Sequence, residues 1–99
     1  VAEALYFNAF QLNKEKQFGQ SNQIISKIAQ LGAASGKWNV KALLLLAKNY
    51  YKLEDSFQAI FVLESIIENF ELYPDEIEAA KRLLKRYNSN EKVIVNEIK

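Results

Sequence analysis

The sequence predicts an all-α protein, an array of about five helices arranged as antiparallel hairpins. Apolar residues recur at helical spacing along most of the 99 residues, which is the main sign of amphipathic helices. Three glycines and one proline are too few for a β fold with many tight turns. Small residues also lie 12 positions apart, in Leu43-x-x-Leu46-Ala47-x-x-Tyr50 followed by Ala59-x-x-x-Leu63. Ala47 and Ala59 at matching heights would let two antiparallel helices approach closely.

Two helices are expected before the glycine-containing loop. The first spans about residues 2–16, and its apolar side carries Leu5, Ala9 and Leu12. A break is expected at Phe18-Gly19. The second spans about residues 20–31, with apolar residues at helical spacing: Ile24, Ile25, Ile28 and Leu31. Ser21 or Asn22 is its candidate N-cap, with Ser21 alternatively a small packing residue, and the loop from Gly32 to Gly36 ends the helix.

Three helices are expected after this loop. The third spans about residues 38–53 and is apolar nearly all round from Ala42 to Ala47, so it should be the most buried. The fourth spans about residues 57–70, with Asp55 or Ser56 as its N-cap. Pro74 opens the fifth, which extends to about residue 87 with acids at its start and bases near its end. For residues 88–99, a further helix and a strand around residues 93–95 both stay open.

Composition argues against catalysis. The chain contains no cysteine and no histidine, so disulfides, thiolate or imidazole metal ligands and a histidine base are excluded. It has no glycine-rich phosphate-binding motif. Glu64 and Glu68 lie one turn apart on an outer helix face, and Ser56 near Lys52 fits a helix cap. We therefore expect no enzyme activity, no cofactor and no metal.

Charge is unevenly distributed along the chain, although the net charge is only +1. Residues 14–52 contain seven lysines and one acid, and residues 54–78 contain eight acids and no base. A basic cluster follows: Lys81, Arg82, Lys85 and Arg86. The pI of about 8.1 lies below the range typical of nucleic-acid-binding domains, and no nucleic-acid-binding motif is present. No apolar run is long enough to cross a bilayer. We expect neither nucleic acid binding nor membrane insertion, and the compartment stays undetermined.

The unit around Ala47 and Ala59 resembles the tetratricopeptide repeat family. A weaker copy, Leu5-x-x-Asn8-Ala9-x-x-Leu12 followed by Ser21-x-x-x-Ile25, has the same 12-residue separation between small residues. Ala9 and Ala47 lie 38 residues apart, and Ala47 and Ala80 lie 33 apart, close to the family period of about 34. The stretch from Leu44 to Ala59 is similar to repeats near the ends of long bacterial proteins of this family.

This resemblance implies a right-handed helical solenoid and divides the chain. Repeat one covers about residues 2–35, repeat two about 38–71 and a half repeat about 74–87, so the repeat domain is 1–87 and the tail is 88–99. Asn8 and Pro74 depart from the family pattern, and an unrelated five-helix bundle is the alternative. Because the chain contains no methionine, we expect it to be a fragment or processed product of a longer protein.

The resemblance also implies a function, because the first helix of each pair in this family lines a concave groove that binds peptides. The residues expected on that face are mainly basic and aromatic: Tyr6, Phe10, Lys14, Lys41, Leu44, Lys48, Tyr51, Lys52, Lys81 and Lys85. Cations beside aromatic and apolar side chains suit an acidic or carboxylate-bearing peptide with apolar anchors. The alternative for the aromatic residues is plain packing between helices.

A structural role is the alternative to peptide binding. The chain would then be an assembly segment of a longer solenoid, stacking on its neighbours without a dedicated peptide site. Arrays of this kind need a polar end, and Val93, Ile94, Val95 and Ile98 of the tail are candidates to cover an open apolar face. This alternative leaves homo-oligomerisation open.

Overall fold

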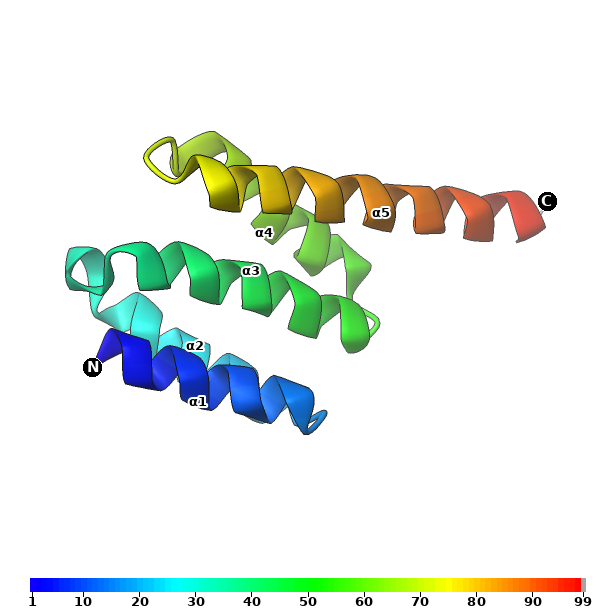
Figure 1. Cartoon of the computed structure of the whole chain (residues 1–99). Helices are drawn as coiled ribbons and strands as arrows, with labels where there is room; N and C mark the ends of the chain where they lie inside the picture. Colours follow the sequence, from blue (N-terminus) through cyan, green and yellow to red (C-terminus); the bar gives the residue numbers. More distant parts are fainter. Residues whose placement is uncertain (99) are drawn as a thin grey trace.

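The computed structural model describes the backbone of residues 1–98 and the side chains of residues 1–91. Its helices are α1 (Ala2–Lys14), α2 (Phe18–Gln30), α3 (Lys37–Lys52), α4 (Ser56–Asn69) and α5 (Pro74–Ile98), with a short 3-10 helix, η1 (Gly32–Ser35). No strand occurs among the described residues. The predicted all-α array of five helices is therefore confirmed (Figure 1).

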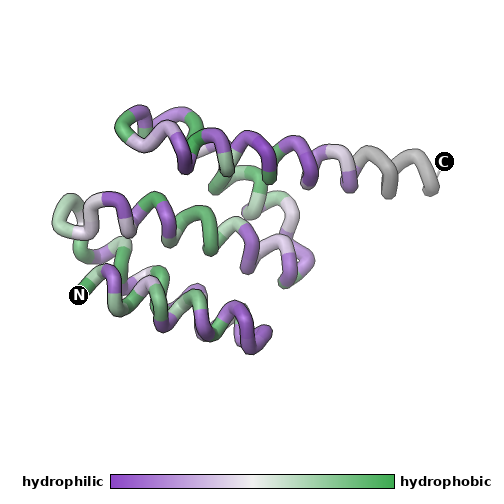
Figure 2. Tube along the Cα trace, viewed as in Figure 1, coloured by the Kyte–Doolittle hydropathy of each residue, from purple (hydrophilic) through white to green (hydrophobic). Residues whose placement is uncertain are grey.

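The helices form two layers. One layer contains α1, α3 and α5, which run in the same direction side by side, and α2 and α4 lie behind it (Figure 1). Consecutive helices pack as hairpins, α1 against α2 and α3 against α4, and α5 packs against both α4 and α3. The middle of α3 is the most hydrophobic part of its layer, whereas α5 up to residue 91 is largely hydrophilic (Figure 2).

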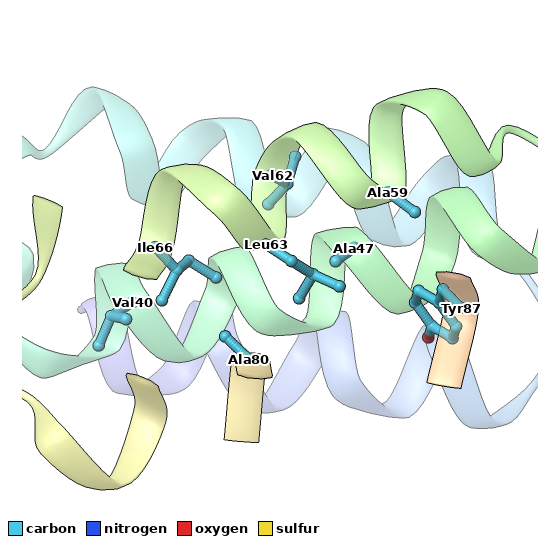
Figure 3. Close-up of a cluster of buried hydrophobic side chains, with 8 residues drawn as sticks. All are labelled: Val40, Ala47, Ala59, Val62, Leu63, Ile66, Ala80 and Tyr87. Carbon is cyan, nitrogen blue, oxygen red and sulfur yellow. The ribbon is translucent and has the colours of Figure 1, made fainter. Parts of the chain in front are cut away.

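The two small residues singled out in the sequence lie at the centre of the core. Ala47 and Ala59 are completely buried, as is Ala80 on α5. Large side chains from α3, α4 and α5 surround them in one cluster: Val40, Val62, Leu63, Ile66 and Tyr87 (Figure 3). A second cluster joins α1, α2 and α3 and comprises Ala9, Ile25, Ile28, Ala42 and Leu45. Since α3 contributes to both clusters, it is the central helix of the molecule.

The turns that close the two hairpins have the same backbone, displaced by 38 residues. Lys16 and Glu54 both adopt the left-handed conformation, with φ of 62° and 64°. In each turn the following N–H donates five residues back, Gln17 to the Leu12 carbonyl at 2.8 Å and Asp55 to the Tyr50 carbonyl at 2.9 Å. This is the long hydrogen bond of a Schellman motif. The α1–α2 and α3–α4 hairpins are therefore structural repeats at their turns.

A buried polar network fixes α1, α2 and α3 relative to one another. Asn49 is completely buried, and its Nδ2 donates to Ser21 Oγ and to Asn22 Oδ1, both at 2.8 Å. Its Oδ1 accepts from Asn13 Nδ2 at 2.7 Å. Ser21 Oγ in turn donates to the Ala9 carbonyl at 2.8 Å. Ser21 is thus a packing residue that donates a hydrogen bond to Ala9, the small residue 12 positions before it in the sequence. It does not cap α2.

Helix boundaries differ from the expected ones at three places. The first break falls at residues 15–17 instead of Phe18-Gly19, because the left-handed Lys16 ends the turn and α2 already begins at Phe18. The loop from Gly32 to Gly36 contains η1. The tail does not start a new element, because α5 continues unbroken to Ile98. The expected covering role of Val93, Ile94, Val95 and Ile98 lies outside the described side chains.

Candidate functional site

Two adjacent hollows lie on the face formed by α1, α3 and α5. The first, of about 100 Å³, lies between α1 and α3 and is lined by Tyr6, Phe10, Lys41, Leu44, Leu45 and Lys48. The second, of about 280 Å³, lies between α3 and α5 and is lined by Leu44, Lys48, Ala79, Arg82, Leu83 and Arg86. Leu44 and Lys48 line both hollows. We refer to the two hollows together as the groove.

Aromatic rings form the α1 side of the groove. Tyr6 and Phe10 stack with their ring centroids 6.2 Å apart, and the Trp38 ring at the start of α3 lies 5.5 Å from Tyr6. Lys14 Nζ lies 4.8 Å from the centroid of Phe10, close enough for a cation–π contact. Burial raises the pKa of the Tyr6 hydroxyl above its ordinary value, so this phenol stays neutral and acts as a donor or acceptor of hydrogen bonds.

Cations form the α5 side of the groove. Arg82 and Arg86 are exposed one helical turn apart, and Lys48 faces them from α3. Lys41 is held by Glu76, with Nζ and a carboxylate oxygen 3.6 Å apart, so that its charge is largely balanced. Among the residues with described side chains, no ion pair engages Lys48, Arg82 or Arg86. Three cations of the groove are therefore left to attract an anionic group.

The structure brings together five of the predicted groove residues: Tyr6, Phe10, Lys41, Leu44 and Lys48. Lys14 lies beside them, over Phe10. Lys52 is exposed at the end of α3 and lines neither hollow.

Tyr51, another predicted groove residue, instead joins α3 to α5. Its ring stacks on Tyr87 with centroids 3.8 Å apart and planes 5° apart. Its hydroxyl accepts a hydrogen bond from Asn90 Nδ2 at 2.9 Å. Tyr51 therefore lines neither hollow of the groove, and its contacts are those of the alternative, packing between helices.

The structure places the predicted groove residues of α5 outside the two hollows. Lys81 and Lys85 are exposed and line neither hollow, and Lys81 Nζ lies 4.0 Å from Glu78 on the same helix. Arg82 and Arg86 take their place. Ala80 and Tyr87 mark the buried side of α5, and this signal was available in the sequence. The buried side alone does not tell the two flanks of α5 apart, however, and only the packing of α5 against α3 shows which flank adjoins the groove.

The described residues do not bring together the groups that metal chemistry requires. None of them form a cluster of three or more carboxylates that could hold a metal ion. A third hollow, at the C-terminal end of α3, is lined by Tyr51, Glu54, Ser56 and Glu91. Its two carboxylates come from the turn after α3 and from α5, and none of the lysines and arginines with described side chains lines it. Within the part of the chain that the structure describes, no helix combines the length and the apolar character needed to cross a membrane.

Comparison with known proteins gives no further guide to this site: no family model, curated protein or solved structure matches the chain. The groove is therefore interpreted from its own geometry and charge.

Proposed function

We propose that this protein is an interaction module whose groove binds a peptide or protein segment carrying carboxylates next to apolar side chains. One observation carries the proposal. Leu44 and Lys48 line both hollows, so an apolar floor and a cationic rim continue from α1 across α3 to α5. A segment lying across α3 would contact both hollows at once.

The side chains of the groove suit such a ligand. Arg82 and Arg86 carry planar guanidinium groups, which bind carboxylates through two parallel hydrogen bonds. Lys48 adds a flexible cation at the centre. Tyr6 and Phe10 are rigid rings that lose little conformational entropy when an apolar anchor packs on them. The groove thus offers aromatic contacts at one end and carboxylate-binding groups at the other.

The resemblance to the tetratricopeptide repeat family supports the same proposal. In the proposed repeat arrangement, the helices that line the groove, α1, α3 and α5, are the first helices of successive repeats, and first helices bind peptides in that family. The two hairpin turns repeat at a spacing of 38 residues, and the additional residues relative to the family period of about 34 lie between Ser21 and Ala47, in the loop that contains η1 and in the longer first part of α3.

Binding of defined peptides tests this proposal. Fluorescent peptides that combine Asp or Glu with Leu or Phe would be titrated with the wild type and with Lys48→Glu/Arg82→Glu, followed by fluorescence anisotropy. We expect the double variant to lose at least about tenfold in affinity. A hydrogen bond to a charged group contributes about 1.5–3 kcal/mol, and about 1.4 kcal/mol corresponds to tenfold.

The chain offers a matched control in Lys81→Glu/Lys85→Glu. This variant has the same change in net charge, but its substituted residues line neither hollow. It should bind the peptides like the wild type. Equal losses in both double variants would show that only the overall charge attracts the peptides, and unchanged binding in the groove variant would remove the groove as the site.

A further inference from the structure

The outer face of α4 carries an exposed row of two phenylalanines and two glutamates. Phe57 and Phe61 are 79% and 59% exposed, and Glu64 and Glu68 are exposed further along the same helix. At about 100° per residue, these four side chains fall within roughly 60° of one another around the helix axis. We refer to Phe57, Phe61, Glu64 and Glu68 as the α4 ridge.

The ridge does not take part in the core of the protein. The opposite side of α4 carries Ala59, Leu63 and Ile66, which are completely buried against α3 and α5. Phe57 is among the most exposed large apolar residues of the described chain, although burying a phenylalanine is favourable by about 1.5–3 kcal/mol. Two adjacent exposed rings are therefore a surface that gains from being covered.

The distribution of charge indicates which partner covers the α4 ridge. The ridge lies within residues 54–78, which contain eight acids and no base, and the groove has three cations without an ion pair among the described side chains. We propose that the groove of one molecule receives the α4 ridge of a second copy. This inference rests on the proposed function, since it names the ligand of the same groove.

Spacing supports this pairing. The midpoint of Phe57 and Phe61 lies seven residues before the midpoint of Glu64 and Glu68, which is about 10 Å along a helix that rises about 1.5 Å per residue. The two hollows flank α3 between neighbouring helices, and packed helices lie about 8–10 Å apart. The phenylalanines can therefore pack over the aromatic hollow between α1 and α3 while the glutamates reach Arg82 and Arg86.

The two surfaces lie on opposite layers of the molecule, so a single chain cannot satisfy both with itself. The groove is on the α1–α3–α5 layer, and α4 lies in the layer behind it (Figure 1). Such a contact is heterologous, because different patches meet, and it continues from molecule to molecule into a head-to-tail chain or a closed ring. We expect sedimentation velocity to show species that grow with protein concentration, up to about 1 mM, which marks the weak end of the affinity scale.

Two charge-reversed variants test the pairing. Lys48→Glu/Arg82→Glu alters the groove and Glu64→Lys/Glu68→Lys alters the ridge, and each variant alone should sediment as a monomer. The two variants should associate when mixed, because every interface between them joins opposite charges. Association of the wild type should weaken between about 0.05 M and about 0.5 M NaCl, since salt screens exposed charges. Phe57→Ser/Phe61→Ser should abolish association without changing any charge.

The outcomes separate this inference from the function on which it rests. A wild type that stays monomeric at all concentrations, or two variants that stay monomeric when mixed, would overturn the pairing. If the acidic peptides still bind the groove in that case, the proposed function stands and the partner is a different protein. Self-association that persists in Phe57→Ser/Phe61→Ser would also overturn the pairing, because the ridge would then not be needed.

Discussion

At the scale of single residues, Asn49 is an unusual member of the core. Its amide is completely buried and has three hydrogen bonds to α1 and α2, with donor–acceptor distances of 2.7–2.8 Å. The large majority of buried polar side-chain atoms in proteins have a hydrogen-bond partner, and the described structure leaves no buried side-chain polar atom without one. Asn49 therefore sets the register of α3 against the first hairpin at a point where apolar contacts alone would tolerate a shift.

Replacing Asn49 by Leu should destabilise the protein by about 1–3 kcal/mol, because Asn13 and Asn22 lose their partner and a tight polar site receives a branched apolar side chain. The measurement is the free energy of unfolding in urea. Asn88→Leu, on the exposed side of α5, is the control and should change stability by less than about 0.5 kcal/mol. Similar losses in both variants would show that the network has no special role.

Tyr87 provides a prediction for the dependence of stability on pH. Its burial raises the pKa of the phenol above the ordinary value of 10.0, and the neighbouring Tyr51 raises it further while Arg86 lowers it. Below pH 10 the phenol is neutral in both the folded and the unfolded chain, and its contribution to stability is present in full. As the pH rises above 10, the unfolded chain ionises first, so stability falls until the folded pKa is passed.

Tyr87→Phe should therefore reduce the loss of stability on the alkaline side. The measurement is the urea midpoint at pH values from about 8 to about 11, compared between the variant and the wild type. The loss should become smaller without vanishing, because burial raises the pKa of Tyr6 in the same direction. An unchanged slope in the variant would mean that Tyr87 ionises equally in both states.

At the scale of helices and turns, the two repeated turns differ in one useful respect. Asp55 caps α4, and its carboxylate accepts a hydrogen bond from the Gln58 N–H at 3.1 Å. Gln17 holds the equivalent position before α2, with φ and ψ of −93° and 65° against −109° and 70° for Asp55, but it makes no side-chain cap. The first turn thus has the backbone of a capped helix without the cap.

Gln17→Asp should stabilise the protein by about 0.5–1 kcal/mol. The aspartate carboxylate at this position accepts a hydrogen bond from a backbone N–H in the first turn of α2, and its negative charge interacts favourably with the positive end of the helix dipole. The reciprocal change, Asp55→Gln, should destabilise it by a similar amount. Both are measured as shifts in the thermal midpoint. A loss of stability in Gln17→Asp would contradict the equivalence of the two turns.

The helices could be predicted from the sequence more completely than the face that each presents. Apolar spacing and the pairing of Ala47 with Ala59 gave the hairpins, and the cap at Asp55 was one of two named candidates. The network around Asn49 was missed, since the residues around this asparagine in the sequence give no sign of its hydrogen-bond partners. The sequence also did not indicate that Arg82 and Arg86 line the hollow between α3 and α5, because periodicity around Ala80 defines a buried side but not its neighbours.

At the scale of the whole molecule, stability depends on one shared helix. One core cluster joins α1, α2 and α3, and the other joins α3, α4 and α5. Among the described helices, neither α1 nor α2 contacts α4 or α5. Damage in one cluster should therefore be transmitted to the other only through α3, and unfolding should be cooperative as long as α3 remains a single helix.

Ala59→Leu tests this coupling. The longer side chain overpacks the core cluster in which Ala59 is completely buried, which should cost about 1–3 kcal/mol. The fluorescence of Trp38, which lies at the start of α3 against α1, should then shift in urea midpoint as much as the far-ultraviolet circular dichroism does. Ala29→Leu, at an exposed position of α2, is the control. An unchanged urea midpoint of the Trp38 fluorescence would show that the two halves of the molecule unfold independently.

The central position of α3 also has a consequence for ligand binding. Both hollows lie along the flanks of α3. A small rotation of the α1–α2 hairpin relative to α4 and α5, about the axis of α3, would therefore change the widths of the hollows while each core cluster stays intact. A ligand bound to α1 and α5 at the same time would restrict this rotation. Bound and free molecules would then differ in stiffness more than in shape, and the suppressed bending would set an entropic cost on every ligand that spans the groove.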